Sequence, residues 1–301
     1  MATAAAEFPS VGGLSLRRRI FAYLGWTLCA LAFLLLSGAM IWILSMVFLR
    51  GLSALSLGIL THTTEGTGGG LLNAIEGSLL LAFVGILFAA PLGLAAGIYL
   101  AEYDTGALAP TIRFFNDVMV GLPSIVVGYF GYVTMVSTLG WNFSLLAGSI
   151  ALAIIALPYI CRTSEMAIRQ VPRSMREAAF ALGASDSRVA LSICVPIAMP
   201  GVLTGILLAL AIAIGETAPL IYTAGWTDYL WTGHFTKEPV AYLTYVIWAF
   251  ISEPFDSAHA LAYAAAFFVT LFVLIIGVLS RLALDENAGW KNWAKRGAKH
   301  K

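Results

Sequence analysis

Six apolar runs divide this chain, and they constrain its fold more than any other feature. A helix needs about 20 predominantly apolar residues to cross the hydrocarbon core of a bilayer. Hydrophobic residues make up 60% of the chain and charged residues only 11%, whereas soluble domains carry roughly 25% charged residues. We therefore expect an all-α membrane protein with six transmembrane helices. The runs lie at roughly 20–49, 74–100, 114–136, 143–161, 198–222 and 260–282.

The basic residues lie in alternate intervals between these runs. Cytoplasmic loops carry an excess of Lys and Arg. If the N-terminal interval and every second interval after it face the cytoplasm, that side holds 15 of the 17 basic residues, and Arg50 and Lys237 lie on the other. Both termini are then cytoplasmic. The expected organisation is a cytoplasmic N-terminal tail at 1–19, a first transmembrane helix at 20–49, a core at 74–283 and a basic cytoplasmic tail at 284–301.

The cytoplasmic interval 171–196 has the pattern of two short helices around a turn. The apolar positions of its first helix recur at i, i+3, i+4 and i+7, which places them on one face. They are Met175, Ala178, Ala179 and Leu182. Gly183 stands where this helix needs a left-handed closing residue. We predict an amphipathic hairpin between two spans, with Arg173, Arg176 and Glu177 beside the apolar face.

The spacing within this interval is specific. Glu177-Ala178-Ala179 precedes Gly183 by three residues, and Ile193 and Pro196 follow at fixed distances. This pattern resembles the EAA loop of ABC importer permeases, although Val195 stands where the family usually has Leu. The resemblance implies that the loop docks on an ATPase subunit. The implied coupling residues are Met175, Arg176, Glu177, Ala178, Ala179, Leu182 and Gly183. The alternative is a hairpin that merely connects two helices.

Two further features interrupt the apolar runs. Pro123 and Ser124 lie in the third run, where Pro allows a kink if neighbouring helices or water satisfy the freed backbone groups. A pore-lining helix and helix packing through small residues remain alternatives here. Glu216 is the only charged residue of the fifth run. A charge at membrane depth is costly, so Glu216 is a functional candidate; the alternative is a structural Glu that is protonated or paired.

Three stretches, at 97–103, 123–126 and 215–220, resemble the phosphate transport permease (PstA) family of ABC importers. The similarity covers about 74–283. It implies a subunit of the bacterial inner membrane, in contact with lipid, that pairs with a PstC-like sister permease. It also implies two PstB-like ATPase subunits that bind ATP and Mg, and a PstS-like phosphate-binding protein on the outer side. The translocation-path candidates are Pro123, Ser124, Glu216 and Thr217.

One position departs from the family pattern. PstA proteins commonly carry an Arg about one helical turn before the Glu, and here 211–214 is apolar. Phosphate carries one to two negative charges, and moving it to low dielectric without compensation is prohibitive. We therefore expect the sister permease to supply the cation, with Glu216 holding that cation or another in place and Thr217 offering a hydroxyl to the anion.

The chain has no motif for catalysis, nucleotide binding or metal binding. It lacks a G-x-x-x-x-G-K-[ST] loop, and its Cys and His residues lack metal-ligand spacing. We expect a non-catalytic subunit without a cofactor or nucleic-acid partner, served by an ATPase on a separate chain. A permease for another oxyanion or solute and, from a different class, an ion-coupled carrier using Glu216 are the alternatives. The apolar segment 240–251 is too short to span, so we expect an interfacial or re-entrant helix there.

Overall fold

The computed structural model describes residues 16–103, 106 and 108–285. Its long helices are α1 (Leu16–Ala54), α3 (Leu72–Glu102), α6 (Leu145–Arg169), α9 (Val195–Gly215) and α12 (Asp256–Asp285). The shorter ones are α2 (Leu57–Thr61), α4 (Leu108–Gly121), α5 (Ser124–Gly131), α7 (Arg173–Ala181), α8 (Asp186–Val189), α10 (Ala218–Thr223) and α11 (Leu243–Phe250). Segments η2 (Tyr132–Thr138) and η3 (Ala190–Cys194) are π-helical, and β1 (Thr64–Glu65) pairs with β2 (Gly68–Gly69) in an antiparallel hairpin.

The chain divides into two units, 1–49 and 50–301. In the first, the described residues form most of α1, and its most apolar stretch buries no side chain within the structure. A helix that is apolar all round is stable only inside a membrane or a larger assembly. The second unit holds all the other elements.

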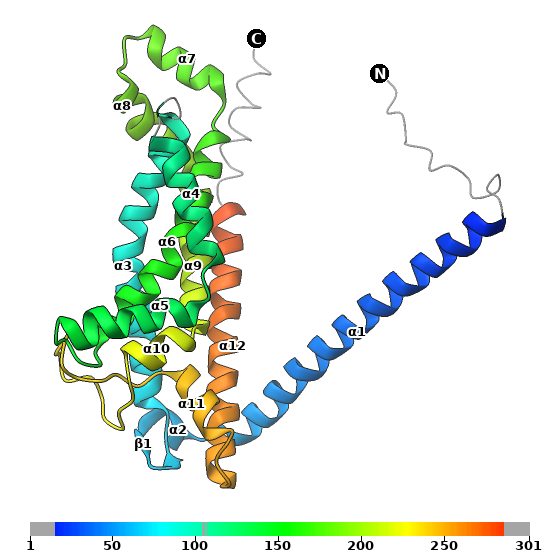
Figure 1. The fold of residues 1–301 in the computed structure, drawn as a ribbon, viewed down its shortest axis with the longest axis vertical. Helices are drawn as coiled ribbons and strands as arrows, with labels where there is room; N and C mark the ends of the chain where they lie inside the picture. The colour runs from blue at the N-terminus through cyan, green and yellow to red at the C-terminus, as the bar shows by residue number, and fades with distance from the viewer. Residues whose placement is uncertain (1–15, 104–105, 107, 286–301) are drawn as a thin grey trace. The chain divides into compact units, whose positions relative to one another are not determined.

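Four long helices form the core of the second unit: α3 packs on α6, α6 on α9, and α9 on α12 (Figure 1). Small residues let α3 approach α6 closely. A Cβ atom on Gly93 would lie 2.9 Å from Ile160 Cβ, and one on Gly97 would lie 2.6 Å from Ser164 Cβ. Such contacts are typical of helix packing in membranes, where close backbone approach replaces a hydrophobic driving force. The chain is accordingly a multi-pass membrane protein.

The expected number of spans is close to the observed one, but two spans differ in shape. Among the described residues, five helices are long and apolar enough to cross a membrane, or six if one bent pair counts as a single span. That pair takes the place of the expected third span: α4 and the segment 124–138 meet at 98°, a far sharper bend than the kink expected at Pro123. The expected fifth span, 198–222, is also wrong in extent, since α9 ends at Gly215 and α10 begins at Ala218.

The second unit has two distinct ends. Helices α7 and α8 lie at one end of the bundle, and α2, β1 and α11 lie at the other (Figure 1). At the latter end, the side-chain amide of Asn73 joins the start of α3 to β1 and to the loop after α10, because its Oδ1 accepts from Thr64 Oγ1 at 3.1 Å and its Nδ2 donates to the Thr227 carbonyl at 2.9 Å. The expected short helix at 240–251 is α11, of eight residues.

The expected terminal tails lie mostly outside the described residues. Of the tail at 1–19, residues 16–19 already belong to α1. Of the tail at 284–301, residues 286–301 are outside the description, and α12 continues to Asp285.

Candidate functional site

The two helix breaks lie against each other. Pro123 precedes α5 with an extended backbone (φ −59°, ψ 132°), which ends α4 and redirects the chain. Glu216 follows α9 with a similar backbone (φ −72°, ψ 136°). Helix α5 packs on α10 so tightly that a Cβ atom on Gly128 would lie 2.6 Å from Pro219 Cα. The structure therefore brings together the two sequence stretches that were predicted to line a translocation path.

Glu216 is contacted from two sides at the end of α9. The side chain of Ser124 in α5 lies next to its carboxylate. Its backbone carbonyl accepts from Thr244 Oγ1 of α11 at 2.8 Å. Within the described ranges, no cationic side chain forms an ion pair with this carboxylate. The backbone of Glu216 is therefore held by this chain, and the residues described here place a hydroxyl but no countercharge next to its carboxylate.

Thr217 lies at the other side of the same break. It precedes α10, and its carbonyl accepts from the Leu220 and Ile221 amides at 3.1 and 3.2 Å. Its side chain is half-buried and makes no capping bond. The residues that precede Glu216 are apolar, and Ala213 and Ile214 are buried in the core. The break thus offers a hydroxyl and a carboxylate, but no arginine fork that would bind an anion.

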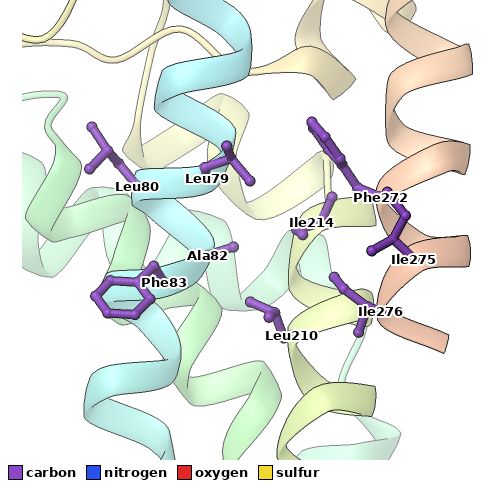
Figure 2. A pocket seen from close by; sticks show the side chains of 9 residues that line it. All are labelled: Leu79, Leu80, Ala82, Phe83, Leu210, Ile214, Phe272, Ile275 and Ile276. Atoms are coloured by element: carbon purple, nitrogen blue, oxygen red, sulfur yellow. The ribbon is translucent and has the colours of Figure 1, made fainter. Parts of the chain in front are cut away.

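A separate cavity of about 470 Å³ lies between α3, α9 and α12. Figure 2 shows that its nine labelled side chains are all apolar. They are Leu79, Leu80, Ala82, Phe83, Leu210, Ile214, Phe272, Ile275 and Ile276. An anion in this cavity would lose its hydration without gaining a hydrogen bond, which is unfavourable by several kcal/mol or more. The cavity is therefore no candidate for a phosphate site.

The second candidate site is the hairpin of α7 and α8. Gly183 has φ +79°, as expected for the residue that closes α7. Its amide donates to the Phe180 carbonyl at 2.9 Å, and the Ala184 amide donates to the Ala179 carbonyl at 3.1 Å. This pair of bonds is the Schellman motif, which satisfies carbonyls at a helix end. The predicted short helix and its glycine stop are confirmed.

The expected apolar face of α7 is divided between solvent and core. The side chains of Leu182 (89% exposed) and Met175 (39% exposed) are accessible, and Glu177 and Ala178 are also exposed. Ala179, in contrast, is buried in a cluster of its own chain with Ile168, Val171, Val189, Cys194, Ala198 and Val202. Ala179 therefore contributes to the packing of its own chain rather than to the exposed surface of α7.

The side chain of Arg176 likewise contacts its own chain. Its guanidinium contacts Glu102 Oε1 at 2.8 Å and the Ile168 carbonyl at 2.9 Å, and its Nε lies 3.3 Å from Cys194 Sγ. These contacts point into the chain, so Arg176 binds neighbouring segments of its own subunit. Burial lowers the pKa of this guanidinium, but the bond to Cys194 and the charge of Glu102 outweigh burial and raise it.

A second charge cluster lies beside the first and was not predicted from the sequence. Glu165 of α6 pairs with Arg113 of α4 at 2.9 Å and with Arg169 at 3.0 Å. Both arginines also donate to the Leu100 carbonyl near the end of α3, at 3.3 and 3.1 Å. The four-residue spacing of Glu165 and Arg169 is a sequence signal for a helical ion pair. No sequence pattern, in contrast, indicates the contact between Glu165 and Arg113.

Comparison with known proteins shows which family this chain belongs to. The family model described as "Binding-protein-dependent transport system inner membrane component" matches residues 93–285. The fold agrees, since an inward-facing structure of the MetNI methionine ABC transporter matches with a TM-score of 0.60 at 18% identity. That match covers 71% of this chain and 95% of the MetNI chain.

Curated relatives match over nearly the whole sequence. "Phosphate transport system permease protein PstA 2" of Mycobacterium bovis is 41% identical over 97% of this chain and 94% of that protein. "Phosphate transport system permease protein PstA" of Pasteurella multocida is 42% identical over 82% of this chain and 88% of that protein. The chain therefore belongs to the binding-protein-dependent inner membrane components and, among them, to the PstA permease family.

Proposed function

We propose that this chain is the PstA-type permease subunit of an ATP-driven phosphate importer in a bacterial inner membrane. One structural observation supports the proposal independently of the relatives' names. Two stretches far apart in the sequence, around Ser124 and around Glu216, meet where α5 packs on α10. Both stretches interrupt membrane helices, and irregular backbone at membrane depth is tolerated where it is buried in protein or lines a cavity.

The exposed side of α7 is the proposed ATPase contact. Leu182, Met175 and Ala178 are accessible there, with Glu177 beside them. We assign these four residues and the Gly183 turn to docking on an ATPase subunit, which binds ATP and Mg itself. Two such subunits would serve the pair formed by this chain and a sister permease. Their closure and opening would displace α7 and switch the path between its outward-facing and inward-facing states.

The proposed path is asymmetric between the two permeases. Glu216 lies next to Ser124, its backbone is held by Thr244, and no described cation of this chain pairs with it. An unpaired carboxylate would repel phosphate and would be costly at membrane depth. In the proposal, an arginine of the sister permease pairs with Glu216 and neutralises the passing phosphate, which a receptor delivers from outside.

The test is uptake by the reconstituted complex in sealed vesicles. The vesicles contain this chain, the sister permease and the ATPase, with ATP inside the lumen that corresponds to the cytoplasm and the soluble receptor on the other side. ATP-dependent, receptor-dependent uptake of radiolabelled phosphate is the expected result. Uptake of sulfate or another solute in place of phosphate would assign a different substrate. Uptake driven by an ion gradient without ATP would identify a carrier.

A second preparation tests the asymmetry. It contains this permease and the ATPase but lacks the sister permease. We expect no receptor-dependent phosphate uptake from it, because each Glu216 would then face another Glu216 rather than a cation. Robust uptake by this preparation would refute the asymmetric path and leave the assignment as a phosphate permease intact.

A further inference from the structure

Arg176 lies on the helix that is proposed to dock on the ATPase, yet its side chain points away from that docking face. It reaches three other segments. Glu102 near the end of α3 lies 2.8 Å away, the Ile168 carbonyl of α6 lies 2.9 Å away, and Cys194 Sγ of η3 lies 3.3 Å away. A single guanidinium therefore joins α7 to the ends of two core helices and to the start of a third membrane segment.

The surroundings make this contact stronger than an ordinary surface ion pair. The side chains of Arg176 and Glu102 are 19% and 13% exposed, whereas Arg162 and Asp117 form a pair with 64% and 68% exposure at 3.5 Å. Exposed pairs contribute little because water screens them. Removing one partner of a half-buried pair, in contrast, leaves a charge with poor solvation.

The end of α3 is bound by a second cluster as well. The Leu100 carbonyl accepts from Arg113 and Arg169, which are also paired with Glu165. Cations at a helix C-terminus are favourable because they meet the negative end of the helix dipole and its unpaired carbonyls. The last turn of α3 is therefore attached to α4 and α6 through one cluster, and to α7 through Arg176.

We propose that Arg176 is a positioning residue that couples α7 to α3 through Glu102, so that a displacement of α7 by the ATPase moves the core helices as a unit. The inference rests on the proposed docking role of α7. Helix α7 is continuous with α6 through 170–172 and with α8 through 182–185, and neither link leads to α3. Without the ion pair, α7 can turn about these two short links while the end of α3 stays in place.

The first test measures phosphate transported per ATP hydrolysed in the reconstituted complex. Arg176→Gln removes the charge, and Arg173→Gln removes the same charge from an exposed position one turn earlier. We expect Arg176→Gln to lower the ratio about tenfold while ATP hydrolysis continues, because two charge-assisted bonds are lost. Arg173→Gln should retain the wild-type ratio. Equal ratios in the two variants would overturn the proposal.

Two further variants separate coupling from folding. Arg176→Lys keeps the charge but cannot make all three contacts, so it should give an intermediate ratio. The exchange Glu102→Arg with Arg176→Glu restores an ion pair of opposite polarity. It should recover more coupling than either single change, and failure to exceed both single variants would count against the pair. If the complex with Arg176→Gln does not assemble, the ratio of phosphate transported to ATP hydrolysed in these two variants tests the coupling role instead.

A second measurement does not depend on the substrate. Hydrogen exchange of backbone amides is followed in the assembled complex with and without nucleotide. In the wild type, nucleotide should change exchange in both α7 and the last turn of α3. In Arg176→Gln the change should remain in α7 and disappear from α3. Retention of the α3 response would refute the coupling role, even if the complex transported a solute other than phosphate. Absence of phosphate uptake in the wild type would instead refute the proposed function.

Discussion

Gly128 and Pro219 lie in direct backbone contact, where a side chain on Gly128 has no room. A Cβ atom there would lie 2.6 Å from Pro219 Cα and 3.0 Å from its carbonyl oxygen. Both atoms belong to the backbone, so neither can move aside as a flexible side chain could. This contact joins α5, which follows the break at Pro123, to α10, which follows the break at Glu216. The relative position of Ser124 and Glu216 therefore depends on a glycine.

Replacing Gly128 with Ala tests that dependence. The added methyl group must push α5 away from α10, which we expect to cost about 1–3 kcal/mol of stability, as overpacking does in cores. Phosphate uptake should fall as well, because Ser124 moves relative to Glu216. Gly121→Ala is the matched control, since a Cβ atom at Gly121 meets no heavy atom within 4 Å. Thermal unfolding in detergent and uptake in vesicles provide the two measurements, and equal behaviour of the two variants would contradict the role of this contact.

The sequence was sufficient to predict the membrane segments but not their bends. Length and hydropathy determine whether a run can cross a bilayer. They carry no information on direction, and apolar residues predominate on both sides of Pro123 and again up to Gly215. The 98° turn between α4 and the following segment is therefore invisible in the hydropathy. Proline marked the position of that break, whereas its angle depends on the packing of α5 against α10.

The candidate sites were predictable to a similar degree. Helical periodicity placed Ala179 on the same face as Met175 and Leu182, but it did not show which edge of that face turns inward. The structure buries Ala179 and exposes Leu182. The partner of Arg176 was also beyond sequence reasoning, because Glu102 lies 74 positions earlier. Such long-range pairs follow from the approach of α3 to α6 and α9, which no local pattern encodes.

Neighbouring alanines on α7 should respond to the same substitution in different ways. Ala179→Leu adds three carbon atoms inside the cluster with Ile168 and Cys194, so we expect it to lower the stability of the isolated subunit by about 1–3 kcal/mol. Ala178→Leu adds them at an exposed position. It should leave the isolated subunit unchanged and weaken binding of the ATPase, which analytical binding in detergent measures.

Two outcomes would contradict the expected difference between Ala178→Leu and Ala179→Leu. If Ala178→Leu destabilises the isolated subunit as much as Ala179→Leu does, the assignment of buried and exposed sides is wrong. If Ala178→Leu leaves ATPase binding at the wild-type level, the exposed side of α7 is not the docking face. Leu182→Ser provides an independent check, because Leu182 is 89% exposed and its loss should affect only binding to the ATPase.

The turn after α7 should tolerate asparagine better than valine. Gly183 has φ +79°, and a Cβ atom there meets no heavy atom within 4 Å. The cost of a substitution is therefore conformational rather than steric. A left-handed backbone costs non-glycine residues about 1–2 kcal/mol, less for Asn and more for β-branched residues. Gly183→Asn should retain most phosphate uptake, and Gly183→Val should abolish it while the receptor still binds. Wild-type uptake and ATP hydrolysis in Gly183→Val would disprove the need for this turn.

Glu216 is the residue on which the asymmetric path depends. Glu216→Gln keeps the size of the side chain and its ability to accept a hydrogen bond but removes the charge. If the carboxylate holds a cation of the sister permease, its loss releases that cation, and phosphate uptake should fall about tenfold or more, as expected for an intramembrane charge that loses its partner. Receptor affinity should not change, because binding of the receptor does not involve this depth of the path.

Ser124→Ala separates the charge of Glu216 from its orientation. It removes the hydroxyl that lies next to the carboxylate but leaves the charge in place. A neutral donor lost to a charged acceptor costs about 1.5–3 kcal/mol at most, and Thr244 still holds the Glu216 backbone at 2.8 Å. We therefore expect a smaller loss of uptake than in Glu216→Gln. An equal loss in both variants would show that orientation rather than charge is decisive, and undiminished uptake in Glu216→Gln would remove the ion pair from the mechanism.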